Sequence, residues 1–83
     1  MEKRSVLIVD DEEDILLVLS KRLSSEGYDT STAKTGREAL SKARLMMPDL
    51  ILLDVMMKDL DGMEVKKRLN QEEQTADIPV IFL

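Results

Sequence analysis

Two stretches decide the fold of this 83-residue chain: Ser5-Val-Leu-Ile-Val-Asp-Asp11 and Asp49-Leu-Ile-Leu-Leu-Asp54. Each is a short, uninterrupted apolar run that ends abruptly in an acidic residue. Apolar runs of this length are typical of strands that are buried on both faces, as in a parallel sheet. The two stretches therefore predict central strands with Asp10, Asp11 and Asp54 at their carboxyl ends.

Helical patterns lie between and around these strands. Residues 12–26 have acids in the first turn, leucines at positions 16, 19 and 23, and Gly27 after the last turn, which predicts a helix. Thr35 and Glu38 form a capping-box pattern that begins a second helix, and Pro48 ends it. We expect the apolar stripe of this helix to consist of Ala39, Leu40, Ala43, Met46 and Met47.

The rest of the chain continues the alternation of strands and helices. Residues 28–33 predict a short, half-exposed strand, and Ile78–Leu83 predict a final apolar strand. Between them, Asp61 to about Asn70 predicts a third helix, lined on one side by Met63, Val65 and Leu69. The order strand–helix–strand–helix–strand–helix–strand predicts one α/β domain, a doubly wound parallel sheet with helices on both faces.

The composition excludes several classes of function. The chain has no Cys and no His, so thiolate zinc sites and Ser–His or Cys–His catalysis are absent. Seventeen acidic against 12 basic residues give a net charge of −5, the wrong sign for direct nucleic-acid contact. Apolar runs of about five residues are too short to span a membrane. We expect a cytoplasmic domain whose chemistry depends on carboxylates.

The acids at the two strand ends form the candidate site. In a parallel sheet these strands are expected to be neighbours, so Asp10, Asp11 and Asp54 would meet at one edge, where doubly wound sheets bind ligands. Carboxylates ~5 Å apart repel by roughly 3 kcal/mol per pair, which a hard divalent cation such as Mg²⁺ would relieve. The alternative is that the acids only cap the next helix, which would explain Asp11 but not Asp54.

Four segments together resemble the receiver domain of two-component response regulators: residues 6–12, residues 48–57, Asp61-Gly62 and residues 78–83. The resemblance runs across the whole chain and implies a flavodoxin-like fold with strand order 2-1-3-4-5. Residues 1–83 would then be the N-terminal two-thirds of a receiver domain. The order 2-1-3-4 would be present, and the fifth strand and the last two helices would be missing.

The resemblance also implies roles for individual residues. Asp54 would be the phosphoacceptor, taking a phosphoryl group from a phosphohistidine on a sensor histidine kinase or phosphotransfer protein. Mg²⁺ would be held by Asp11, Asp54 and the backbone carbonyl of Met56, and by Asp10 through water. The chain would then be a phosphoprotein of a two-component phosphorelay that regulates an output, and not an enzyme acting on other molecules.

The chain departs from the family pattern at two places. Lys58 stands where the family usually has Pro, which puts a cation near the site. The Ser or Thr after the fourth strand and the Lys after the fifth strand would lie beyond Leu83. The alternative function is therefore a truncated or non-phosphorylatable receiver fragment that acts as an interaction or structural module. A Mg²⁺-dependent phosphohydrolase is a third hypothesis, but no second acid for water activation is evident.

Two surfaces are candidates for contacts with partners. The five apolar residues from Ile15 to Leu19 lie on all sides of the first helix, more than one core face requires. We therefore expect Ile15 and Val18 to lie outside the core and beside the acids. They would pack against a later helix of the fold or dock on the helical bundle of a kinase. The final strand, Ile78–Leu83, would be an edge of the sheet and could allow self-association.

Overall fold

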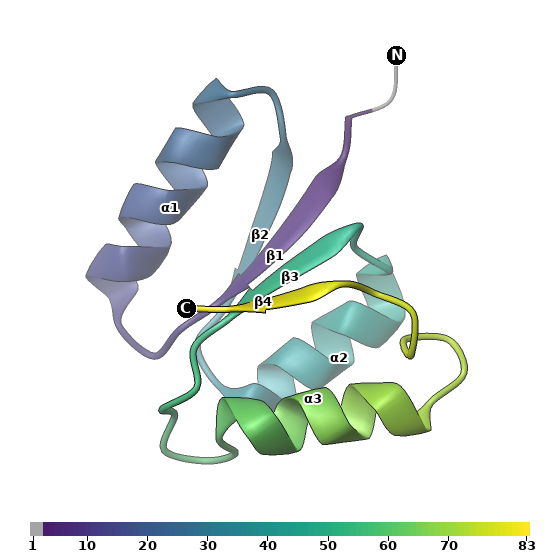
Figure 1. Ribbon diagram of the computed structural model, residues 1–83. Helices are drawn as coiled ribbons and strands as arrows, with labels where there is room; N and C mark the ends of the chain where they lie inside the picture. Colours follow the sequence, from purple (N-terminus) through teal and green to yellow (C-terminus); the bar gives the residue numbers. More distant parts are fainter. Residues whose placement is uncertain (1–2) are drawn as a thin grey trace.

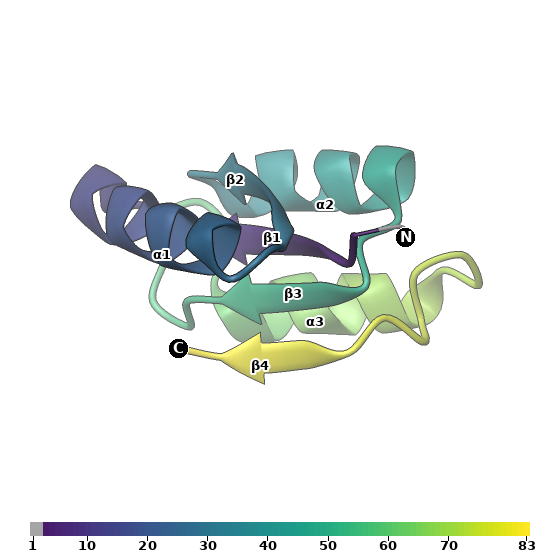
Figure 2. The ribbon, with the colours of Figure 1, turned by 90° about the horizontal axis from the view of Figure 1, so that it is seen from above.

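Four parallel strands form one sheet in the order β2-β1-β3-β4 in the computed structural model, which describes residues 3–83. The strands are β1 (Ser5–Val9), β2 (Asp29–Ala33), β3 (Leu50–Leu53) and β4 (Val80–Phe82). Helix α1 (Glu13–Ser25) covers one face of the sheet, and α2 (Gly36–Met46) and α3 (Gly62–Gln71) cover the other (Figures 1 and 2). This arrangement confirms the predicted doubly wound sheet and its strand order.

Side-chain alternation along β1 and β3 divides the core into two layers. On the side of α2 and α3, the strand residues Leu7, Val9, Ile51 and Leu53 pack with Ala39, Leu40, Ala43, Val65 and Leu69. On the side of α1, Val6 and Ile8 pack with Leu16, Leu19 and Leu23. Because successive strand residues point to opposite faces, an unbroken apolar run supplies both layers at once.

Local hydrogen bonds explain where the helices begin and end. Thr35 Oγ1 accepts from the Glu38 N–H (3.0 Å), and Asp61 Oδ1 accepts from the Glu64 N–H (2.8 Å). Glu38 Oε1 accepts from the N–H of Lys34 (2.7 Å), one residue before the N-cap. The first two bonds satisfy N–H groups that the first turn of a helix leaves without partners, and the third ties the residue before the N-cap to the same turn.

Several predicted boundaries and inward-facing residues were wrong. The last strand begins at Val80, because Ile78 and Pro79 belong to the loop that leads into it. The second strand begins at Asp29 and excludes Tyr28. Met46 and Met47 are exposed, because Pro48 disfavours a helical conformation at Met47, which adopts a left-handed φ of 47° as the C-cap.

Met63 was also predicted to face the core, and it is exposed. Val65 and Leu69, four residues apart, define the buried face of α3. Met63 lies two positions from Val65, a rotation of about 200° at 100° per residue, and therefore points into solvent. The buried face of α3 therefore contains fewer apolar side chains than the sequence pattern indicated.

Strand β4 lies at one edge of the sheet, and Ile81, Phe82 and Leu83 are exposed there. Self-association through this edge stays a prediction. Within residues 3–83, no helix has both the length and the apolar character that crossing a membrane requires.

The Glu38 carboxylate should make stability depend on acid pH. The hydrogen bond from the Lys34 N–H, with help from Lys42, lowers the pKa of Glu38 from its ordinary value of 4.5 against the opposing effect of burial. A lowered pKa stabilises the fold above the ordinary value, and that stabilisation is lost as pH falls through the lowered one. In Glu38→Gln, the melting temperature should therefore fall less than in the wild type as the pH is lowered below 4.5.

Thr35→Ala provides the control, because it removes the other half of the cap without removing a titrating group. Thr35→Ala should lower the free energy of unfolding by about 1 kcal/mol at every pH, measured by thermal unfolding with circular dichroism. Parallel pH profiles for the wild type and Glu38→Gln would contradict the assignment.

Candidate functional site

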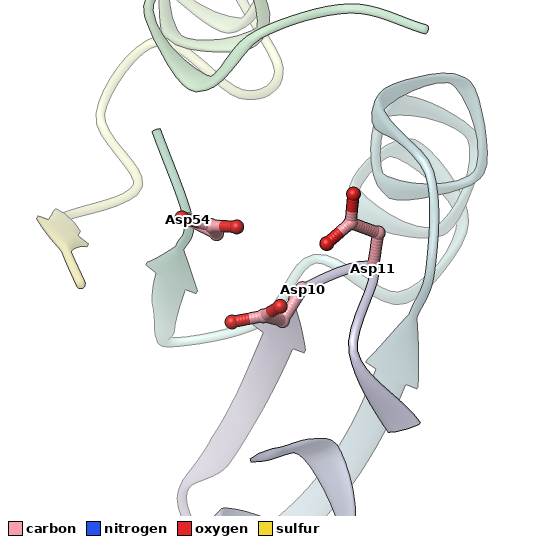
Figure 3. A group of neighbouring side chains, drawn as sticks. All are labelled: Asp10, Asp11 and Asp54. Atoms are coloured by element: carbon pink, nitrogen blue, oxygen red, sulfur yellow. The ribbon is translucent and has the colours of Figure 1, made fainter. Parts of the chain in front are cut away.

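Three carboxylates meet at the carboxyl ends of β1 and β3. Asp10, Asp11 and Asp54 each place a carboxylate oxygen within 4.8 Å of the others. Figure 3 shows the three side chains turned toward a shared space between the two strand ends. The pairing of β1 with β3 aligns these ends: Val9 lies opposite Leu53, and the Asp54 N–H donates to the Val9 carbonyl at 2.9 Å.

Asp10 is the buried member of the cluster, with 4% of its surface exposed. Its Oδ1 accepts a hydrogen bond from the Glu12 N–H (2.9 Å). Glu12 is the N-cap residue of α1 and makes no side-chain cap of its own. The interpretation that capping explains Asp11 is therefore wrong: Asp10 serves the start of the helix, and the half-buried Asp11 side chain lines an open groove.

Asp54 is half-buried and directly follows β3. Its Oδ1 accepts from the Met56 N–H at 3.2 Å, which orients the carboxylate. Among residues 3–83, no backbone or side-chain group donates a hydrogen bond to Oδ2 of Asp54. One carboxylate oxygen is thus held by the backbone, and the other is available to a ligand.

Gly62 fixes the backbone of Asp54, a role that the sequence analysis missed. The Gly62 N–H donates to the Val55 carbonyl at 2.8 Å. A Cβ at position 62 would lie 2.5 Å from the Asp54 carbonyl oxygen and 2.8 Å from Cα of Val55, closer than any side chain tolerates. The pair Asp61-Gly62 can be seen in the sequence, but the contact of Gly62 with Asp54 and Val55 is known only from the fold.

A groove opens beside the carboxylates on the side of the loop that follows β3. Its lining residues are Asp11, Glu12, Val55, Met56, Met57, Lys58 and Asp61. Met57 is buried in the core, whereas Met56 is 82% exposed. Lys58 brings a positive charge to a wall that is otherwise acidic or apolar.

The donor set fits a hard divalent cation. Carboxylate oxygens are the ligands preferred by Mg²⁺ and Ca²⁺, and the small number of protein ligands leaves positions for water, as Mg²⁺ prefers. The mutual repulsion of three carboxylates within 4.8 Å gives a cation a clear electrostatic advantage at this place. The cluster could therefore hold a hard cation next to a free carboxylate oxygen.

A second, more apolar pocket adjoins the same carboxylates on the side of α1. It is lined by Asp10, Asp14, Ile15, Val18, Leu19, Asp54 and Leu83. Ile15 and Val18 are 36% and 65% exposed, whereas Leu16, one residue along from Ile15, is buried in the core. The structure thus places the two candidate docking residues beside Asp54.

Comparisons with known proteins agree on one family. A family model of the response regulator receiver domain matches residues 6–83. The chain is 51% identical over 80 residues to the alkaline phosphatase synthesis transcriptional regulatory protein PhoP of Bacillus subtilis (strain 168), covering 96% of this chain and 32% of that protein. It therefore spans about a third of the length of this relative.

Solved structures give the same result. The N-terminal domain of a response regulator receiver protein from Methanoculleus marisnigri JR1 matches with a TM-score of 0.92 at 40% identity, covering 94% of this chain and 63% of that one. The chemotaxis response regulator CheY4 of Vibrio cholerae matches with a TM-score of 0.94 at 36% identity, covering 98% and 68%. These likenesses confirm the flavodoxin-like fold.

Proposed function

The chain belongs to the response regulator receiver domain family, and on that premise we propose that Asp54 accepts a phosphoryl group from a phosphohistidine. The observation that carries this proposal is the convergence of Asp10, Asp11 and Asp54 within 4.8 Å at the ends of β1 and β3. The donor would be a sensor histidine kinase or a phosphotransfer protein, because a chain without His cannot supply the phosphohistidine itself.

The transfer forms a P–O bond to the Asp54 carboxylate and breaks the P–N bond of the donor. The imidazole nitrogen keeps the electron pair and takes up a proton. Oδ2 of Asp54 is the proposed nucleophile, because Oδ1 is engaged by the Met56 N–H. This hydrogen bond holds the carboxylate in one orientation, so the attacking oxygen is placed in advance.

The incoming phosphoryl group carries negative charge into a site that already holds three carboxylates. We propose that Mg²⁺ is held by Asp11, Asp54 and the backbone carbonyl of Met56, and by Asp10 through water. The bound cation supplies neutralisation of charge on the phosphoryl oxygens. The burial of Asp10 and its hydrogen bond to the Glu12 N–H support an indirect role for Asp10.

The pocket on the side of α1 supports a docking role for Ile15 and Val18. Both side chains are partly exposed and line an apolar pocket that also reaches Asp54. A helical bundle that presents a phosphohistidine could bury these side chains while it delivers the phosphoryl group. We therefore propose that the first helix contacts the kinase or the phosphotransfer protein.

A separate proposal concerns what phosphorylation of this domain regulates. PhoP, which is named a transcriptional regulatory protein, extends well beyond the part that this chain matches. We propose that phosphorylation of Asp54 regulates an output that other segments or proteins supply. On this account the chain is a regulatory phosphoacceptor whose chemistry is confined to its own carboxylate.

The phosphoacceptor proposal is tested with a small phosphodonor. Incubation with phosphoramidate and Mg²⁺ should add the mass of one phosphoryl group, and peptide mapping should place it on Asp54. Asp54→Asn should gain no such mass, and omission of Mg²⁺ should abolish the adduct in the wild type. A folded wild-type protein that gains no mass would refute the proposal and favour the alternative of an interaction or structural module.

The docking proposal is tested by charge substitutions on α1. Ile15→Asp and Val18→Asp should each slow phosphotransfer from phosphorylated histidine kinase cores about tenfold, equivalent to about 1.4 kcal/mol. Leu17→Asp is the matched control, because Leu17 is 54% exposed on the same helix but does not line the pocket. Phosphorylation by phosphoramidate should be unchanged in all three variants. Equal phosphotransfer rates in the three variants would place docking elsewhere.

A further inference from the structure

We infer that Asp59 is a positioning residue that fastens the phosphoacceptor loop, residues 55–61, to the start of α2. This contact sets how tightly the site holds its cation and how fast Asp54 accepts a phosphoryl group. The inference rests on the proposed function, because the loop carries Met56 and follows Asp54. Figure 1 shows the loop between β3 and α3 beside the first turn of α2.

The carboxylate of Asp59 makes two hydrogen bonds to another helix. Oδ1 accepts from the Gly36 N–H at 2.9 Å, and Oδ2 accepts from the Arg37 N–H at 3.0 Å. Gly36 and Arg37 are the first two residues of α2, whose N–H groups have no partner within the helix. Thr35, the N-cap residue of α2, accepts from the Glu38 N–H instead. Asp59 therefore completes the cap of a helix to which it does not belong.

Close packing at Gly36 supports the same contact independently. A Cβ at position 36 would lie 2.7 Å from Cβ of Leu60, 2.9 Å from its carbonyl oxygen and 2.9 Å from Cγ2 of Val65. The helix start thus lies directly against Leu60 of the loop and Val65 of α3, with no room for a side chain between them. Leu60 in turn packs against the core between the sheet and α2 and α3.

The loop has few other restraints between its fixed ends. Its beginning is held where Gly62 contacts Asp54 and Val55. Met56 and Lys58 are exposed, and Met57 is the buried anchor in the middle. Asp59 supplies the polar restraint next to the exposed Lys58. Without it, the part of the loop after Met57 would lose its hydrogen bonds to α2, and the Met56 carbonyl would be held less firmly relative to Asp54.

Electrostatics favours the ionised form of Asp59 in this position. Partial desolvation acts to raise the pKa of Asp59, but hydrogen bonds from backbone N–H groups, among them those of Gly36 and Arg37, outweigh it and lower the pKa below 3.8. The carboxylate also lies at the positive end of the α2 dipole. Asp59 is therefore a charged clamp at neutral pH.

Three variants separate positioning from general stability. Asp59→Ala removes the clamp, and Asp59→Asn keeps one oxygen acceptor in a side chain of the same shape. Asp49→Ala is the matched control: the Asp49 carboxylate also accepts a backbone N–H, that of Ser5 (2.8 Å), but at the amino ends of β1 and β3, far from the site. For each variant we would measure the melting temperature, the Mg²⁺ dissociation constant by calorimetry, and the rate of phosphorylation by phosphoramidate at saturating Mg²⁺.

We expect Asp59→Ala to weaken Mg²⁺ binding and to slow phosphorylation by about tenfold, as loss of a supporting residue around a metal site does. Asp59→Asn should lose less than Asp59→Ala in both quantities. Asp49→Ala should lower the melting temperature and leave the dissociation constant and the rate unchanged. The inference is overturned if Asp59→Ala matches Asp49→Ala in its Mg²⁺ affinity and phosphorylation rate.

Failure of the proposed function gives a different pattern. If the wild type binds Mg²⁺ but gains no phosphoryl group, the phosphoacceptor proposal fails, and the Mg²⁺ affinities alone decide whether Asp59 positions the loop. If the wild type binds no Mg²⁺, the inference is overturned together with the metal proposal.

Discussion

The parallel pairing of β1 with β3 is the constraint on which the rest of the structure depends. It sets Val9 opposite Leu53, so the two strands end level with each other and their terminal acids come together. The strand interiors are apolar: β1 is buried on both faces, and β3 is buried on the side of α2 and α3 and half-buried on the side of α1, which fixes the register of the pairing. The hydrophobic core therefore supports a cluster of three carboxylates that would repel one another in the absence of a ligand.

The loop after β3 turns this cluster into a defined site. Gly62 packs against the backbone of Asp54, the Met56 N–H orients the Asp54 carboxylate, and Asp59 joins the loop to α2. Together these contacts join the loop to the start of α3, to the end of β3 and to the start of α2. A receiver domain needs such support, because catalytic groups work only when their surroundings hold them in the productive geometry.

The sequence predicted those features that depend on local pattern. The buried strands and the meeting of Asp10, Asp11 and Asp54 follow from apolar runs that end in acids, whereas the strand order was implied only by the family resemblance. Met46, Met47 and Met63 were misplaced, because apolar side chains at helix ends do not reveal which way they face. Asp59 could not have been found, because its partners Gly36 and Arg37 lie more than 20 residues away and carry no pattern that points to it.

The central claim is that the carboxylates form one cation site in which Asp11 binds directly and Asp10 acts through water. Calorimetric titration of Mg²⁺ into the wild type, Asp11→Ala and Asp10→Ala tests it most directly. The account predicts that Asp11→Ala loses more affinity than Asp10→Ala, because the Asp10 carboxylate is buried and already accepts the Glu12 N–H. Equal losses in the two variants, or undiminished binding in Asp11→Ala, would contradict it.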